Sequence, residues 1–172
     1  TRAIASARNI DRSLKGTAAQ GCFVFMTSHG SVDGLYLSKD QDSKRTLSPG
    51  KLDRILDTEC GERPTVVVVS ACHSGVFIGR ASKGDNRIWL TAARDDRPSF
   101  GCNASRQFTV FDQCILDSFV AGSRWLTVME NARSCIDENE RALHVAAPSE
   151  RRAWFGAQVT DLAADAGVVP RR

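Results

Sequence analysis

The stretch Thr65–Gly75, with the sequence TVVVVSACHSG, joins four consecutive valines to a cysteine and a histidine. A short run of β-branched residues closed by serine and glycine is typical of a buried strand in a parallel sheet. A second stretch, Cys22–Gly30, has the sequence CFVFMTSHG and follows the same plan, with a histidine in the place of the cysteine. The two stretches predict two buried strands, each ending in a reactive side chain.

These two strands, expected over 22–27 and 65–70, belong to one sheet. His29 and Cys72 are 43 residues apart, which is enough for one complete crossover between adjacent parallel strands. In open α/β sheets the ligand crevice lies beyond the carboxyl ends of the strands. We therefore expect the imidazole of His29 and the thiol of Cys72 to face the same crevice.

The rest of the chain alternates between helical and strand patterns. Ser48 followed by Pro49 marks a helix start, because serine is a good N-cap and proline fits the first helical position. Apolar residues at helical spacing or in short runs predict the remaining elements: helices over 3–14, 49–60, 108–119 and 125–136, strands over 88–92 and 153–160, a hairpin arm over 35–37 and a solvated loop over 39–46.

This alternation predicts an α/β fold, a three-layer sandwich in which a mostly parallel sheet carries helices on both faces. The chain enters the sheet through a helix, so the strand expected before that helix is missing from the sequence. The length of 172 residues suits one domain that can bury a core. We expect this domain to span residues 1–160 and residues 161–172 to form a loose tail.

The composition is that of an ordinary globular protein, with 42% hydrophobic and 25% charged residues and a net charge of +3. Lysine and arginine are scattered rather than clustered, so we expect no nucleic-acid partner. No apolar stretch reaches the roughly 18 residues of a spanning helix, so no membrane span is expected.

The six cysteines contain no CxxC pair and no Cys/His metal spacing. We therefore expect no metal and no organic cofactor. Cys22, Cys114 and Cys135 lie in apolar patterns and are interpreted as small buried hydrophobic residues. An even number of cysteines also permits disulfides outside the cytosol. The compartment stays open, with an inclination toward a periplasmic or secreted location.

A thiol beside an imidazole is the pair that a cysteine hydrolase needs. The thiolate of Cys72 is the nucleophile, and the imidazole of His29 takes up the proton or stabilises the anion as imidazolium. Gly30 has no side chain to block a substrate, and its N–H, with that of Cys72, is placed to donate to a developing oxyanion. Either side chain alone is commonly structural, and their joint occurrence at two strand ends, which is rarer by chance, leaves a catalytic and a structural role equally open.

A third motif follows the two strand ends: Thr91–Cys102, with the sequence TAARDDRPSFGC. In this order the three motifs resemble the legumain (asparaginyl endopeptidase) family, which belongs to the caspase–haemoglobinase clan of cysteine peptidases. The third motif aligns without gaps on the legumain sequence TAANPRESSYAC. The resemblance covers roughly residues 20–120 and implies a caspase-like fold in a family member of bacterial type. It also implies His29 and Cys72 as catalytic residues, with Gly30 and the Cys72 amide as oxyanion donors.

The substrate pocket is expected to depart from that of legumain. Ser99 lies in the loop that would wall the pocket, and Ser70 stands where legumain has an acidic residue two positions before the cysteine. The aspartate beyond the third motif corresponds to Asp112 or, if the alignment slips by one residue, to Gln113. The arginine and asparagine that end legumain's first strand have no counterpart in this chain. The resemblance therefore predicts a small polar pocket and leaves open whether the enzyme cleaves after asparagine.

Two further features have structural interpretations. His73 directly follows Cys72, and adjacent side chains at a strand end point apart, so His73 is expected to shape the cleft rather than act as a base. The Asp95–Asp96 pair is expected in a solvated loop facing Arg94 and Arg97 rather than in a cation site.

The sequence thus predicts a cysteine endopeptidase that acts on peptides or proteins through a Cys72 acyl-enzyme and that processes itself, as the family resemblance implies. The first alternative is a catalytically inactive caspase-like interaction module, against which the intact Cys72 and His29 pair argues. The second is a redox or zinc-handling thiol protein that uses Cys72, His73 and His29. The lack of a second thiol at CxxC distance argues against it.

Overall fold

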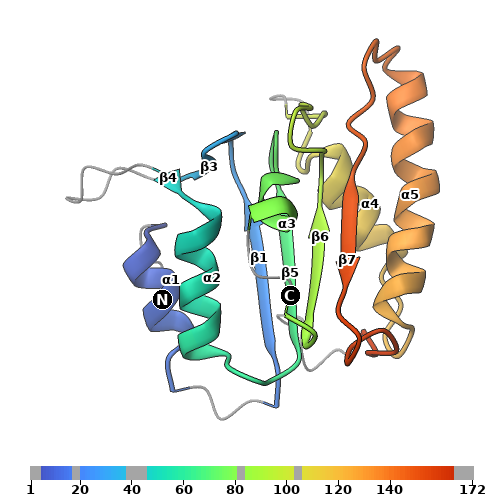
Figure 1. Cartoon of the computed structure of the whole chain (residues 1–172). Coiled ribbons are helices and arrows are strands. Elements are labelled where there is room, and N and C mark those ends of the chain that lie inside the picture. Colours follow the sequence, from blue (N-terminus) through green and yellow to red (C-terminus); the bar gives the residue numbers. More distant parts are fainter. Residues whose placement is uncertain (1–4, 17–19, 38–45, 81–83, 103–105, 165–172) are drawn as a thin grey trace.

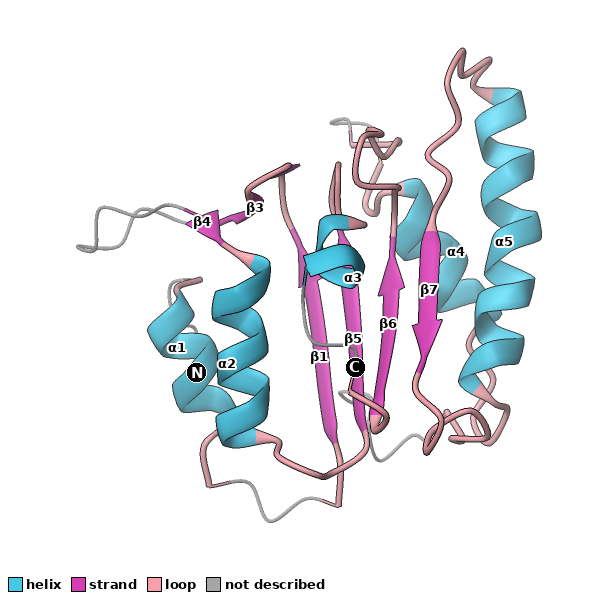
Figure 2. Ribbon diagram, viewed as in Figure 1, coloured by secondary structure: helices cyan, strands magenta, loops and turns pink. Residues whose placement is uncertain are grey.

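The computed structural model describes residues 5–16, 20–37, 46–80, 84–102 and 106–164. Its central sheet has the strand order β1-β5-β6-β7. The strands β1 (Cys22–Thr27), β5 (Thr65–Ser70) and β6 (Arg87–Thr91) are parallel, and β7 (Arg152–Phe155) is antiparallel to β6. Figure 2 shows the four strands side by side, with β7 pointing opposite to the others. The prediction of a mostly parallel sheet is confirmed.

Helices cover both faces of this sheet (Figure 1). Residues of α1 (Ala7–Leu14), α2 (Pro49–Glu59) and α3 (Val76–Arg80) belong to one core cluster, and those of α4 (Val110–Ser118) and α5 (Trp125–Ala142) belong to the other. The predicted three-layer sandwich is therefore confirmed. None of the helices in the described part of the chain combines the length and the apolar character needed to cross a membrane.

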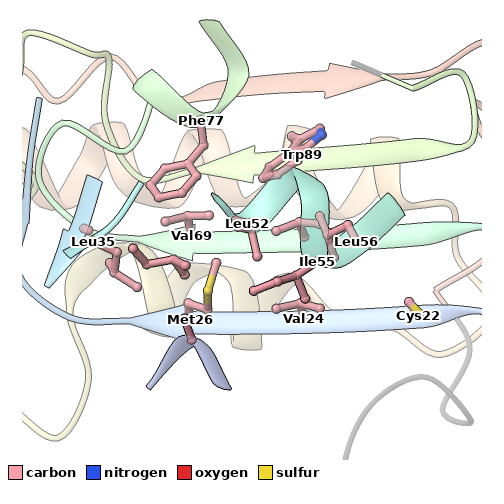
Figure 3. Close-up of a cluster of buried hydrophobic side chains, with 14 of the residues drawn as sticks. Cys22, Val24, Met26, Leu35, Leu52, Ile55, Leu56, Val69, Phe77 and Trp89 are labelled. Atoms are coloured by element: carbon pink, nitrogen blue, oxygen red, sulfur yellow. The ribbon is translucent and has the colours of Figure 1, made fainter. Parts of the chain in front are cut away.

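The position of β5 inside the sheet, between β1 and β6, explains why its sequence is apolar at consecutive positions. All six of its residues are buried, because successive side chains point to opposite faces and both faces are covered. Val67 and Val69 pack in the cluster of α1–α3, where Phe77 stacks on Trp89 with ring centroids 6.4 Å apart (Figure 3). The alternate valines, 66 and 68, pack against α4 and α5.

A small antiparallel sheet follows β1 and consists of β2 (Gly30–Ser31), β3 (Gly34–Tyr36) and β4 (Thr46–Leu47). The expected hairpin arm over 35–37 corresponds to β3. Of the expected loop over 39–46, all but Thr46 lies outside the described residues, and Thr46 begins β4.

The interpretation of three cysteines as small hydrophobic residues is wrong. Cys22 and Cys60 form a disulfide that joins the start of β1 to the C-cap of α2, and Cys114 and Cys135 form one that joins α4 to α5. The Cα atoms of the two pairs are 6.0 and 5.6 Å apart, within the usual range for a disulfide. Helix packing brings these residues together from 38 and 21 positions apart, which the local apolar pattern does not reveal.

Two boundaries near the C-terminus also differ from the prediction. The last strand ends at Phe155 rather than 160, because Gly156 turns the chain against Asp85, close enough that a Cβ would collide with the Asp85 carbonyl.

Residues 161–164 are not a loose tail. Leu162 accepts a hydrogen bond from the Trp125 amide at 3.1 Å, and Ala164 is fully buried. A bridge between residues 124 and 163 docks this segment at the start of α5. Residues 165–172 lie outside the described residues.

The strand that was expected to be missing would lie beside the outer edge of β1. In the described part of the chain, β1 pairs only with β5 and forms one edge of the four-stranded sheet. The site at the carboxyl end of β1 therefore depends on contacts with β5 and with the loops that follow β5 and β6.

Candidate active site

The strand ends of β1 and β5 lie side by side, as predicted. The two strands pair in register from Cys22 opposite Thr65 to Thr27 opposite Ser70. The amide of Ser28 continues the ladder by donating to the carbonyl oxygen of Ser70 at 3.2 Å. His29 and Cys72 each follow two positions after the last register pair. The sheet therefore places the imidazole and the thiol on neighbouring segments at one edge.

Gly30 brings the two segments into direct contact. A methyl group on Gly30 would collide with the carbonyl oxygen of Cys72 and would lie 2.9 Å from Cβ of Ala71. The position therefore requires glycine, because any larger residue would push the histidine segment away from the nucleophile segment.

The thiol of Cys72 is half-buried and lies against Ser99. Cys72 is outside both disulfides, and the Ser99 amide donates to its Sγ at 3.3 Å. The hydroxyl and carbonyl oxygens of Ser99 lie 3.8 Å from the same sulfur. Ser99, expected to wall the substrate pocket, is thus in contact with the sulfur itself.

His29 is exposed and held through its backbone. Its carbonyl oxygen accepts a hydrogen bond from the Tyr36 amide at 2.8 Å, and the hydroxyl of the preceding Ser28 donates to the Tyr36 carbonyl at 2.8 Å. Among the described residues no hydrogen bond joins the His29 ring to Cys72. Such bonds are often long in substrate-free enzymes and tighten when substrate binds.

Ser70 and Asp112 belong to a buried polar cluster beneath the two strand ends, and they are 2% and 3% exposed. Thr27 donates to Oδ2 of Asp112 at 3.1 Å, and the hydroxyls of Ser70 and Thr109 are 3.2 Å apart. Thr109 also caps α4 by accepting from the Asp112 amide at 3.1 Å. The other carboxylate oxygen of Asp112 has no partner in the described part of the chain. Gln113 instead donates to Asp117 on the exposed side of α4, so Asp112 is the residue that reaches the strand ends.

A model of the peptidase C13 family matches residues 4–161, which is nearly the whole chain. The chain belongs to the peptidase C13 family. This is the legumain family of cysteine peptidases, so the domain is a cysteine-type peptidase with the caspase-like fold that the sequence motifs predicted. A search of curated proteins found no match.

The turn that carries Cys72 in this peptidase domain is fastened to the loop after β6, which we call the third loop (residues 92–99). The His73 amide donates to the Arg97 carbonyl at 2.8 Å, and the His73 ring nitrogen Nδ1 lies 3.0 Å from the Asp95 carbonyl oxygen. The Gly75 amide donates to the Ala93 carbonyl at 2.8 Å. His73 has a φ of 59°, a left-handed conformation that these bonds help to hold. These contacts bind His73 to the third loop, and its role in shaping the cleft stays a prediction.

Charged side chains on the third loop pair with one another and with Glu150. Arg94 binds Asp96 through two nitrogens, at 2.5 and 2.8 Å, and binds Glu150 at 2.5 Å. The hydrogen bonds that Arg94 donates to Asp96 lower the pKa of Asp96 from its ordinary value near 3.8 to about 2, and the same bonds raise the pKa of Arg94. The prediction of a solvated loop that faces Arg94 and Arg97 agrees with this pairing. Within the described residues, no group of three or more His, Cys, Asp or Glu residues is arranged to hold a metal ion.

Three contacts of this site were not identified from the sequence. Thr27 and Thr109 bracket the buried polar cluster, and Ser74, which is 1% exposed, accepts a hydrogen bond from the Ala93 amide at 3.1 Å. A signal was present for Thr27, because the predicted register places it opposite Ser70. The other two contacts depend on how α4 and the third loop pack, which the sequence does not show.

Proposed function

We propose that this peptidase is an endopeptidase in which Cys72 is the nucleophile and His29 is its acid–base partner. The observation that carries the proposal is the packing of Gly30 on the Cys72 carbonyl at the end of two strands paired in register. This packing holds the histidine segment beside the nucleophile segment, which supports a role for the His29 imidazole in activating the Cys72 thiol.

In the first half of the proposed reaction, the Cys72 thiolate attacks the carbonyl carbon of the scissile peptide bond. A C–S bond forms, and the π electrons of the carbonyl move onto its oxygen. The amides of Gly30 and Cys72 are the proposed donors to this oxyanion. When the intermediate collapses, the C–N bond breaks, and protonated His29 gives its proton to the departing amine.

In the second half, water hydrolyses the acyl-enzyme. His29 takes a proton from the water as the water oxygen attacks the thioester carbon. The C–S bond then breaks, the new carboxyl group leaves, and the proton on His29 balances the regenerated thiolate. Every proton is carried by the imidazole, so the cycle needs no metal or organic cofactor.

We further propose that Ser99 contacts the substrate side chain that precedes the scissile bond, and that Ser70 and Asp112, which are 2% and 3% exposed, form the buried polar base of that pocket. Ser99 contacts the nucleophile, while Ser70 and Asp112 lie beneath the strand ends. Because Oδ1 of Asp112 is buried and has no donor among the described residues, a carboxyl group at the pocket base disfavours an acidic substrate side chain over one that donates hydrogen bonds. Asparagine and arginine are such side chains, and aspartate is not.

The proposal includes self-processing, which the legumain resemblance implies, and a periplasmic or secreted location. The two disulfides support this location, because disulfides persist mainly in oxidising compartments.

A positional-scanning peptide library, read by mass spectrometry, tests the proposed function. We expect the purified wild-type protein to cleave internal peptide bonds with one preferred residue before the scissile bond, and the Cys72→Ala variant to cleave none. Equal cleavage by Cys72→Ala would exclude Cys72 as the nucleophile. If the folded wild-type protein cleaves no peptide, the inactive interaction module becomes the better interpretation.

A further inference from the structure

The third loop is the part of the molecule that holds the nucleophile turn in place. Its backbone supplies acceptors to the amides of His73 and Gly75, and its Ser99 amide donates to the sulfur of Cys72. The turn is followed by α3, a helix of only five residues. The conformation of the third loop therefore determines where the Cys72 thiol points.

Glu150 fastens the third loop from a distant part of the sequence. Its two carboxylate oxygens bind different arginines of the loop: Oε2 accepts from Arg94 at 2.5 Å, and Oε1 lies 3.5 Å from the Arg97 guanidinium. The Arg94 amide also donates to the carbonyl of Ser149 at 2.8 Å. One carboxylate thus binds the third loop at Arg94 and Arg97, on the two sides of Asp95. The carbonyl oxygen of Asp95 lies 3.0 Å from Nδ1 of the His73 ring.

The segment that carries Glu150 is itself anchored to α5. The Ser149 amide donates to Oε1 of Glu140 at 3.0 Å, and that glutamate is 5% exposed. Arg151 binds both carboxylate oxygens of Asp137, at 2.5 and 2.8 Å. Glu150 is therefore held on both sides by neighbours bonded to a long helix, which makes it a fixed support for the third loop.

The effect of this support is expected on geometry more than on stability. Glu150 and Arg94 are 40% and 27% exposed, and isolated ion pairs at such positions contribute little to the free energy of unfolding. Networks in which one group bridges several partners are more specific, because every bond fixes direction as well as distance. A catalytic thiol is sensitive to such changes, since a displacement of about 1 Å can cost roughly 100-fold in rate.

We propose that Glu150 is a positioning residue for the nucleophile, acting through Arg94 and Arg97 on the third loop and through that loop on Cys72. This proposal rests on the proposed peptidase function but adds a residue that touches neither the substrate nor the thiol. It predicts a change in the reactivity of Cys72 when a charge is removed 78 positions away in the sequence.

The test compares Glu150→Ala and Glu150→Gln with Glu130→Ala, which removes the same charge from an exposed position on α5. Two rates are measured for each variant: peptide cleavage, resolved into kcat and KM, and alkylation of Cys72 by iodoacetamide, mapped by mass spectrometry. Thermal unfolding shows whether each protein is folded at the assay temperature.

We expect Glu150→Ala to lower kcat roughly 10-fold to 100-fold with little change in KM, and to change the alkylation rate of Cys72 while the protein stays folded. Glu150→Gln keeps an acceptor oxygen and should recover part of kcat, and Glu130→Ala should match the wild-type protein. The proposal is wrong if Glu150→Ala keeps both rates within twofold of Glu130→Ala. If the wild-type protein cleaves no peptide, the proposed function fails, but the alkylation rates still decide the role of Glu150.

Discussion

Removing either disulfide should destabilise the domain by a predictable amount. Each bond closes a loop in the unfolded chain, and its loss restores the conformational entropy of that loop. For the separations of 38 and 21 residues, the chain-entropy relation predicts losses of about 3.9 kcal/mol for Cys22–Cys60 and about 3.3 kcal/mol for Cys114–Cys135.

The two losses should add, because the bonds lie on opposite faces of the sheet and share no core cluster. Their sum is about 7 kcal/mol, which is comparable to the entire stability of many domains. For a chain of this length each bond corresponds to a fall in Tm of about 7–15 °C. A variant that lacks both disulfides should therefore be largely unfolded near body temperature.

The assay is urea unfolding followed by circular dichroism, applied to Cys22→Ala/Cys60→Ala and to Cys114→Ala/Cys135→Ala. Cys102→Ser is the matched control, because Cys102 is a free and exposed cysteine, and its substitution should shift stability by less than about 0.5 kcal/mol. A loss below about 1 kcal/mol in either double variant would refute the entropic reasoning. Titration of the denatured wild-type protein should find only the two free thiols, Cys72 and Cys102, and finding six would refute the pairing itself.

Two further predictions concern the site. Gly30→Ala should reduce peptide cleavage by roughly 100-fold or more, because the methyl group displaces the histidine segment from Cys72. Gly50→Ala is the control: its methyl group meets open space, so this variant should keep full activity. Equal cleavage rates in the two variants would contradict the prediction. Asp96 should titrate near pH 2 by NMR, since Arg94 lowers its pKa. Its stabilising contribution is then complete above roughly pH 4 and is lost as the pH falls through about 2. A midpoint near 4 would show that the pairing with Arg94 is absent in solution.

The features that could be predicted from the sequence are those carried by short-range pattern. The valines of β5 imply a strand covered on both faces, and the matching plan of Cys22–Thr27 implies its neighbour. Once two strands are parallel and adjacent, their register alone brings His29 and Cys72 to one edge. The third motif, Thr91–Cys102, added the family, and the match over residues 4–161 confirms it.

The features that escaped prediction depend on contacts between distant segments. Cys22 and Cys114 have apolar neighbours whether or not they are oxidised, so the local pattern did not reveal their partners. Only the packing of α4 shows that Asp112, and not Gln113, contacts Thr27 at the strand ends. Glu150 gave no local signal, because its role depends on where the segment before β7 meets the third loop.

Covalent labelling tests the central claim most directly. The folded protein is treated with peptidyl acyloxymethyl ketones that carry different residues before the reactive group, and adducts are located by intact mass and peptide mapping. We expect a single adduct, on Cys72, that forms in step with the loss of peptidase activity and that slows strongly in His29→Ala. Labelling of Cys102 in preference to Cys72, or loss of activity without an adduct on Cys72, would contradict the assignment of the nucleophile.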